Sequence, residues 1–140
     1  MSLERYIKAQ APVYAQALAE LQHGYKQSHW MWYVFPQIAG LGHSAMSHSY
    51  AIESLDEARE YLAHPVLGAR LGECCRTLME LDGRTAHEIF RSPDDLKFRS
   101  CLTLFAQAAP DESLFDELLV KYFGGKEDPA TLELLADQRR

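Results

Sequence analysis

A stretch of 26 residues, from Gln27 to Ile52, contains no Asp, Glu, Lys or Arg, although 24% of the 140-residue chain is charged. Both tryptophans, Trp30 and Trp32, lie in it, together with three of the six histidines. A run with this many aromatic side chains is expected to be buried or to line a pocket. We therefore expect the rest of the chain to pack around this stretch.

The same stretch is long enough to raise the question of a membrane span. Gln37 and His48 would then lie in lipid, and Pro36 and Gly42 would interrupt the helix, so we reject that reading. The first residues also lack the apolar run of a secretory signal. No contact with membrane is expected.

Size and charge narrow the class of protein further. A chain of 140 residues with 47% hydrophobic content suits one domain, residues 1–140, with a real core. The net charge of −6 argues against extended contact with nucleic acid. The three cysteines, Cys74, Cys75 and Cys101, form a poor disulfide framework, which indicates reduced thiols in a cytoplasmic protein.

Helix start signals recur along the chain, whereas strand alternation is nearly absent. Ser54–Glu57 and Thr85–Glu88 read as capping boxes, and Asp128–Pro129 reads as a cap followed by a proline at the first helical position. Ser28 and Ser44 are expected to cap short helices on either side of Pro36. The pattern predicts an all-α fold, with seven to nine short helices packed at steep angles around one core.

The histidine and amide beside the tryptophans are the first candidates for a site. His29 can face a pocket walled by Trp30 and Trp32 and there move a proton, or it can be a structural histidine bonded to the backbone. Gln37 follows the end of the predicted helix, where its amide can read a ligand edge or hold the turn. We predict His29 as the catalytic residue.

A glycine turn and a lysine are the second set of candidates. Gly40-Leu41-Gly42 before Ser44 can present backbone amides to an anion, or it can be a plain tight turn with Ser44 as the cap. Lys97 can bring a cation to an anionic ligand, or it can be a solvated surface lysine. The predicted ligand contacts are Trp30, Trp32, Gln37, Gly42, Ser44 and Lys97.

No metal or cofactor is expected. The chain has no HExxH motif, and His43 and His48 are five residues apart, a spacing that does not place them on one helical face. It also lacks a Walker loop, a GxSxG elbow and the kinase motifs. Cys101 with a distant histidine can form a nucleophile pair, but a lone cysteine on an apolar helix is usually core.

Three stretches carry a resemblance to a known family: KQSHWMWYVFPQIAGLG from Lys26, YAIESLDEAREYLAHPVLGARL from Tyr50, and SPDDLKFRSCLTLF from Ser92. Over nearly its whole length the chain resembles a bacterial family known as domain of unknown function 1810. The resemblance implies a mainly helical domain, with a glycine where Arg91 stands and a small residue where Cys101 stands. It implies no catalytic roles.

Members of that family sometimes carry the label "calpastatin". A protease inhibitor of that kind is expected to be a disordered, charge-rich chain that folds on its target. This chain is apolar, aromatic and rich in helix caps, so its composition contradicts the label.

Two functions from different classes remain. The first is a small-molecule pocket on the Ser28–Gly42 segment for a nucleotide-like or anionic metabolite, with hydrolysis or group transfer as the reaction if there is one. The second is an interaction module, in which the aromatic run packs a partner protein or a second copy of the chain. A concave opening favours the first, and a flat apolar patch favours the second.

Overall fold

The computed structural model describes residues 3–139, and within them ten helices follow one another. They are α1 (Glu4–Gln10), α2 (Tyr14–Gln22), α3 (Met31–Val34), α4 (Ala45–Ser49), α5 (Leu55–Ala63), α6 (Leu67–Glu80), α7 (Ala86–Phe90), α8 (Asp94–Ala108), α9 (Leu114–Phe123) and α10 (Pro129–Gln138). The predicted all-α class is confirmed. The number exceeds seven to nine because α3, α4 and α7 are separate helices of only four or five residues.

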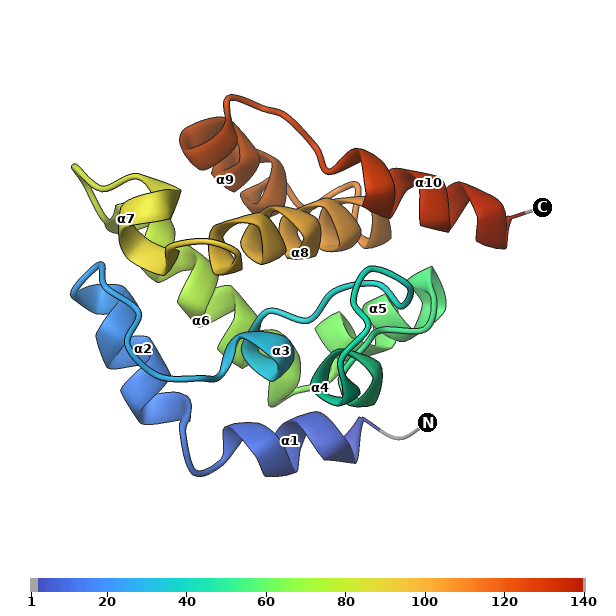
Figure 1. Ribbon diagram of the computed structural model, residues 1–140, viewed down its shortest axis with the longest axis horizontal. Coiled ribbons are helices and arrows are strands. Elements are labelled where there is room, and N and C mark those ends of the chain that lie inside the picture. The colour runs from blue at the N-terminus through green and yellow to red at the C-terminus, as the bar shows by residue number, and fades with distance from the viewer. Residues whose placement is uncertain (1–2, 140) are drawn as a thin grey trace.

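Helix α8 is the centre of the packing. It contacts α5, α7, α9 and α10, and it crosses the middle of the molecule, with α9 and α10 on one side and α1 to α3 on the other (Figure 1). Nine of its 15 residues are buried. The ring of Phe98 lies 5.1 Å from that of Phe35 and 4.8 Å from that of Phe90, which fixes the aromatic stretch to α8.

Several of the predicted helix caps are present. Ser44 accepts a hydrogen bond from the amide of Ser47, and Asp128 accepts one from the amide of Thr131. Thr85 and Glu88 form the predicted reciprocal capping box at the start of α7. These helix starts follow from local sequence, because a short polar side chain satisfies amides that the helix itself leaves free.

Two predicted caps differ in the structure. Ser28 does not cap α3, which begins only at Met31; its hydroxyl instead accepts from the Gln16 amide and donates to Glu20. Ser54 accepts from the amide of Glu57 as predicted, but the Glu57 carboxylate accepts from the amide of Glu53 rather than from that of Ser54. In both places a hydrogen bond outside the local motif stands where the motif predicts another.

The three cysteines are unpaired and buried in the core. Burial raises the pKa of the Cys74 thiol to about 12 and that of Cys101 well above its usual range. A thiol in such surroundings stays protonated, so Cys101 packs rather than acting as a nucleophile. Among residues 3–139, no helix has the length and apolar character needed to cross a bilayer.

Candidate functional site

A hollow of about 260 Å³ lies between Trp32 and the chain segment 37–53. The side chains that bring aromatic or hydrogen-bonding groups to its wall are Trp32, Gln37, Ser47, His48, Tyr50 and Glu53. The rest of the wall comes mostly from the small and apolar residues of 38–42. A concave surface with an aromatic wall and a few polar groups has the character of a small-molecule site.

A two-residue pairing in the backbone sets which side chains reach this hollow. Ile38 and Ile52 form an isolated parallel bridge, in which the Ile52 amide donates to the Gln37 carbonyl at 2.8 Å. Both isoleucine side chains are buried in the core. Because successive side chains of extended backbone point to opposite faces, Gln37 and Glu53 take the other face, which is that of the hollow.

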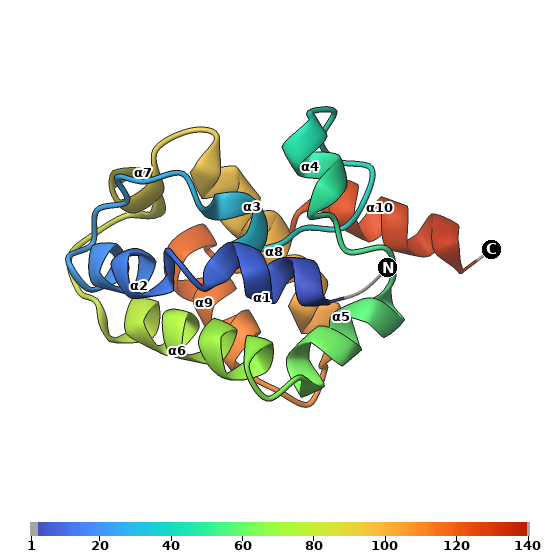
Figure 2. The ribbon, with the colours of Figure 1, turned by 90° about the horizontal axis from the view of Figure 1, so that it is seen from below.

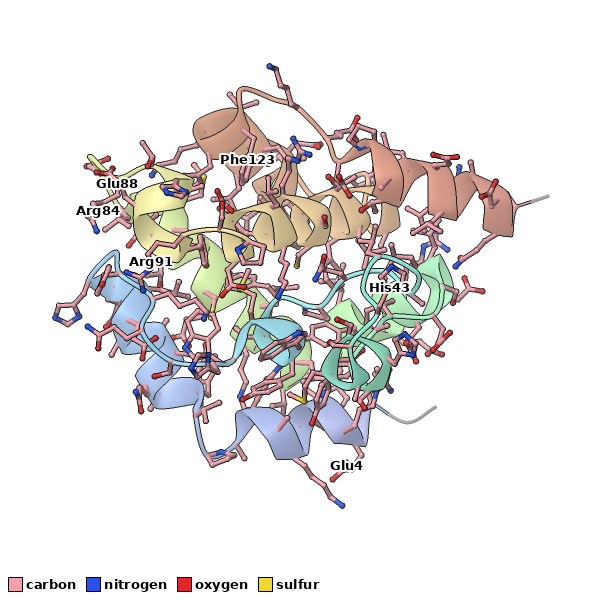
Figure 3. All side chains as sticks on the ribbon, viewed as in Figure 1. Glu4, His43, Arg84, Glu88, Arg91 and Phe123 are labelled. Atoms are coloured by element: carbon pink, nitrogen blue, oxygen red, sulfur yellow. The ribbon has the colours of Figure 1, made fainter. Side chains whose placement is uncertain are left out.

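Helix α4 stands out from the body of the molecule beside the hollow (Figure 2). None of its residues is buried, and the turn that leads into it is marked by His43 in Figure 3. A Cβ atom on Gly42 would lie 2.3 Å from the hydroxyl oxygen of Ser47, so only glycine fits in this turn. The returning chain is held by Arg5, whose guanidinium donates to the carbonyls of Ser49 and Ala51.

Three polar side chains on the wall have no partner in the described part of the chain. The Gln37 amide, the His48 imidazole and the Glu53 carboxylate make no side-chain hydrogen bond or ion pair within residues 3–139. The indole N–H of Trp32 likewise donates to no group there. His48 and Glu53 are exposed and Gln37 is half-buried, so these groups are open to solvent and are available to hydrogen-bond a molecule in the hollow.

The other tryptophan lies in a closed polar network. Trp30 has no exposed surface, and its indole N–H donates to Glu20 of α2 at 2.9 Å. The same carboxylate accepts from the amides of Gln27 and Ser28 and from the Ser28 hydroxyl. Burial alone raises the pKa of Glu20, but these hydrogen bonds outweigh it, and the pKa falls from 4.5 to about 2.

Two lysines lie over the two tryptophan rings and share one aspartate. The ammonium of Lys26 is 5.0 Å from the ring centroid of Trp30, and that of Lys97 is 4.9 Å from the ring centroid of Trp32. Asp94 at the start of α8 accepts ion pairs from Lys26 at 2.9 Å and from Lys97 at 3.4 Å. Lys97 is therefore neither a freely solvated lysine nor part of the wall of the hollow.

The structure brings together only some of the predicted site residues. Trp32, Gln37 and Gly42 line the hollow. The other four, His29, Trp30, Ser44 and Lys97, are not part of its wall. The imidazole of His29 is exposed, with its backbone carbonyl accepting from the Tyr33 hydroxyl, and Ser44 serves as the cap of α4.

Three polar residues on the wall, Ser47, His48 and Glu53, were not predicted. Ser47 and His48 lie in the charge-free stretch, five and four residues before its end, so they were available as candidates. Glu53 is the first charged residue after that stretch. The feature that places Glu53 beside Gln37 is a bridge of one residue pair, which is too short to give strand alternation in the sequence.

The arrangement defines an all-α domain with one aromatic-walled hollow beside a projecting short helix. A family model described as "Protein of unknown function (DUF1810)" matches residues 1–135, and the chain belongs to this family, as the resemblance implied. A solved structure, that of the conserved hypothetical protein Rv1873 from Mycobacterium tuberculosis, is similar. It is 51% identical, with 96% of each chain covered and a TM-score of 0.94. The comparison with curated proteins finds no match.

Proposed function

We propose that this protein binds a planar small molecule of nucleotide-like chemistry in the hollow beside Trp32. The observation that carries this proposal is the convergence of the open polar groups of Gln37, His48 and Glu53 on one aromatic-walled hollow. Stacking on a tryptophan side chain suits any flat ring, and the polar groups then fix its orientation. The unpaired, buried cysteines support a reducing, cytoplasmic setting.

A reaction in this hollow, hydrolysis or group transfer, would use His48 rather than His29. His48 contributes to the wall of the hollow, whereas His29 does not. An imidazole must come within hydrogen-bond reach of the proton that it moves. Binding is therefore the proposed core function, and catalysis by His48 is an extension of it.

The interaction-module alternative requires the aromatic run on the surface. In the structure the exposed fractions of Trp30 and Phe35 are 0%, and that of Met31 is 1%. The large apolar side chains that are exposed in the described residues come instead from other segments: Tyr25, Met46, Val66, Leu96 and Val120. No feature of the aromatic segment favours a docking role over the hollow.

A thermal-shift titration tests the binding proposal. Adenosine, guanosine and their 5′-monophosphates are added to the wild type and to Trp32→Ala, Gln37→Ala and His29→Ala. We expect at least one compound to raise the Tm of the wild type, because a ligand at 100 times its Kd stabilises the folded state by about 2.7 kcal/mol.

The three variants separate the hollow from the rest of the stretch. Trp32→Ala and Gln37→Ala are expected to lose the ligand-induced shift, and His29→Ala, an exposed residue outside the wall, is expected to keep it. The proposal fails if none of the compounds shifts the wild type. It fails equally if all three variants respond as the wild type does.

A further inference from the structure

The charge on the wall of the hollow restricts the part of a ligand that can lie there. Among the described residues that line it, Glu53 brings the one carboxylate, and there is no Lys or Arg. The nearby cations are already engaged, since Arg5 pairs with Glu57 at 3.4 Å and Lys97 pairs with Asp94. A phosphate inside the hollow would therefore face a carboxylate, with no compensating Lys or Arg from residues 3–139 on the wall.

The backbone bridge sets how Glu53 and Gln37 face a ligand. Glu53 lies next to Ile52 on one side of the bridge, and Gln37 lies next to Ile38 on the other, so the two side chains are diagonal neighbours on one face. Paired segments lie about 4.8 Å apart, and residues two positions apart along a segment are separated by about 6.6 Å. The edge of one fused ring fits between two such positions.

A carboxylate in this position selects the donor pattern of the ligand. An ionised carboxylate only accepts hydrogen bonds, and its two oxygens match two adjacent N–H groups. Guanine presents such a pair, its ring N1–H and its exocyclic amine. Adenine presents an amine beside an acceptor nitrogen, which suits an amide better than a carboxylate.

Resting on the proposed function, we propose that the ligand carries a guanine-type base whose two adjacent N–H donors bind the Glu53 carboxylate. Trp32 and Tyr50 supply the apolar wall against the ring, and the Gln37 amide pairs with a further polar atom of the base. Any phosphate on the same ligand lies outside the hollow, away from Glu53.

Isothermal titration calorimetry with guanosine, inosine, adenosine and guanosine 5′-monophosphate tests this assignment. Inosine lacks the exocyclic amine and so loses one hydrogen bond to a charged group. We expect the wild type to bind guanosine about 10-fold or more tightly than inosine, and more tightly than adenosine. Adding the monophosphate is expected to leave the affinity unchanged or to weaken it.

Two carboxylate variants complete the experiment. Glu53→Gln is expected to abolish the preference for guanosine over inosine, because one of the two acceptor oxygens becomes an NH2 donor and opposes one of the two N–H groups of the base. Glu60→Gln, at an exposed glutamate of α5 outside the wall, is the matched control and is expected to keep the preference. Both positions are exposed, so both variants are expected to fold.

The outcomes distinguish this inference from the function on which it rests. If nucleosides bind without base preference, or if Glu53→Gln keeps the preference for guanosine, the guanine assignment is overturned while binding in the hollow stands. Tighter binding of adenosine, or much tighter binding of the monophosphate than of guanosine, also overturns it. If none of the four compounds binds, the proposed function falls and the inference falls with it.

Discussion

Residues 20–30 and residues 37–53 form two polar regions beside the same aromatic core, and they differ in how their polar groups are partnered. In the first, Glu20 accepts hydrogen bonds from Gln27, Ser28 and Trp30. In the second, the side chains of Gln37 and Glu53 face a hollow and have no hydrogen-bond partner in residues 3–139. The regions use similar residue types, so the difference lies in whether a neighbouring element supplies a partner.

The partner in the closed region comes from outside the charge-free stretch. Glu20 lies on α2 and reaches across to the loop before α3, where it replaces the water that the loop amides would otherwise bind. Beside the hollow, the neighbouring element is α4, which stands away from the body (Figure 2). The hydrogen bonds of Glu20 therefore tie α2 to the loop before α3, whereas the side chains of Gln37 and Glu53 add no such contact within residues 3–139.

The largest difference between the regions is expected when the two carboxylates are removed. Glu20→Ala leaves the Trp30 indole and two loop amides without an acceptor, at about 1–3 kcal/mol for each donor that stays buried, so we expect a loss of about 4 kcal/mol. Glu53→Ala is expected to change stability by less than about 0.5 kcal/mol. Urea unfolding measures both, and equal losses would remove the distinction between the regions.

The pH dependence of the free energy of unfolding tests the contribution of Glu20 separately. Folding lowers the pKa of Glu20 from 4.5 to about 2, so its contribution is complete above pH 4.5 and is lost as the pH falls toward about 2. The difference corresponds to about 3 kcal/mol. Urea unfolding between pH 6 and pH 2 should show the stabilities of wild type and Glu20→Gln converging as the pH falls. A constant gap would contradict the role of Glu20.

The two tryptophans allow the same substitution in both regions, with a smaller expected loss of stability than at the carboxylates. Trp30→Phe removes the hydrogen bond to Glu20 and leaves unfilled space in the core, and we expect it to cost about 2 kcal/mol. Trp32→Phe changes a partly exposed ring whose N–H has no partner, and about 0.5 kcal/mol is expected. Chemical denaturation compares the two, and a larger cost at Trp32 would contradict the assignment of Trp30 to the core.

The smallest expected change in stability concerns the backbone of Arg91, which lies on the opposite side of the molecule from His43 (Figure 3). Its φ of 57° and ψ of 168° are typical of glycine, the residue that the family resemblance implied there. Its guanidinium donates to the carbonyl of Lys26 at 2.8 Å and lies over the ring of Tyr25.

Arg91→Gly and Arg91→Ala lose the same contacts, but only the glycine variant relieves the backbone. We expect the glycine variant to be more stable than the alanine variant by about 1 kcal/mol. Thermal unfolding of both variants measures this difference. Equal stabilities would show that the contacts of Arg91, and not its backbone, set its contribution.

The helices were largely predictable because their starts are local. Thr85, Ser44 and Asp128 each accept from the amide three residues further along the chain, so the motif and its structure coincide. Ser28 has the same chemistry but caps no helix, since its hydroxyl accepts from the Gln16 amide and donates to Glu20, both on α2. Prediction failed where a longer-range polar contact competed with the local one.

The site was predictable only in part. Trp32 and Gln37 were expected at a pocket and line the hollow, whereas Trp30 turns the other way into the core. Trp30 precedes and Trp32 lies within a four-residue helix that ends before Pro36, and a helix this short does not fix the phase of the two side chains from residue order. Glu53 was missed because its position depends on the pairing of Ile38 with Ile52.

The sequence by itself determined the all-α class and most of the helix starts, because these depend on residues that are close along the chain. It also predicted that the aromatic stretch is largely covered. Contacts between distant segments determined which polar groups have a partner within the protein. Glu20 accepts the hydrogen bonds of one region, and the bridge of Ile38 with Ile52 turns Gln37 and Glu53 toward the hollow. The physical reason is that capping spans a few residues, whereas the partnering of a buried polar group depends on which element folds against it.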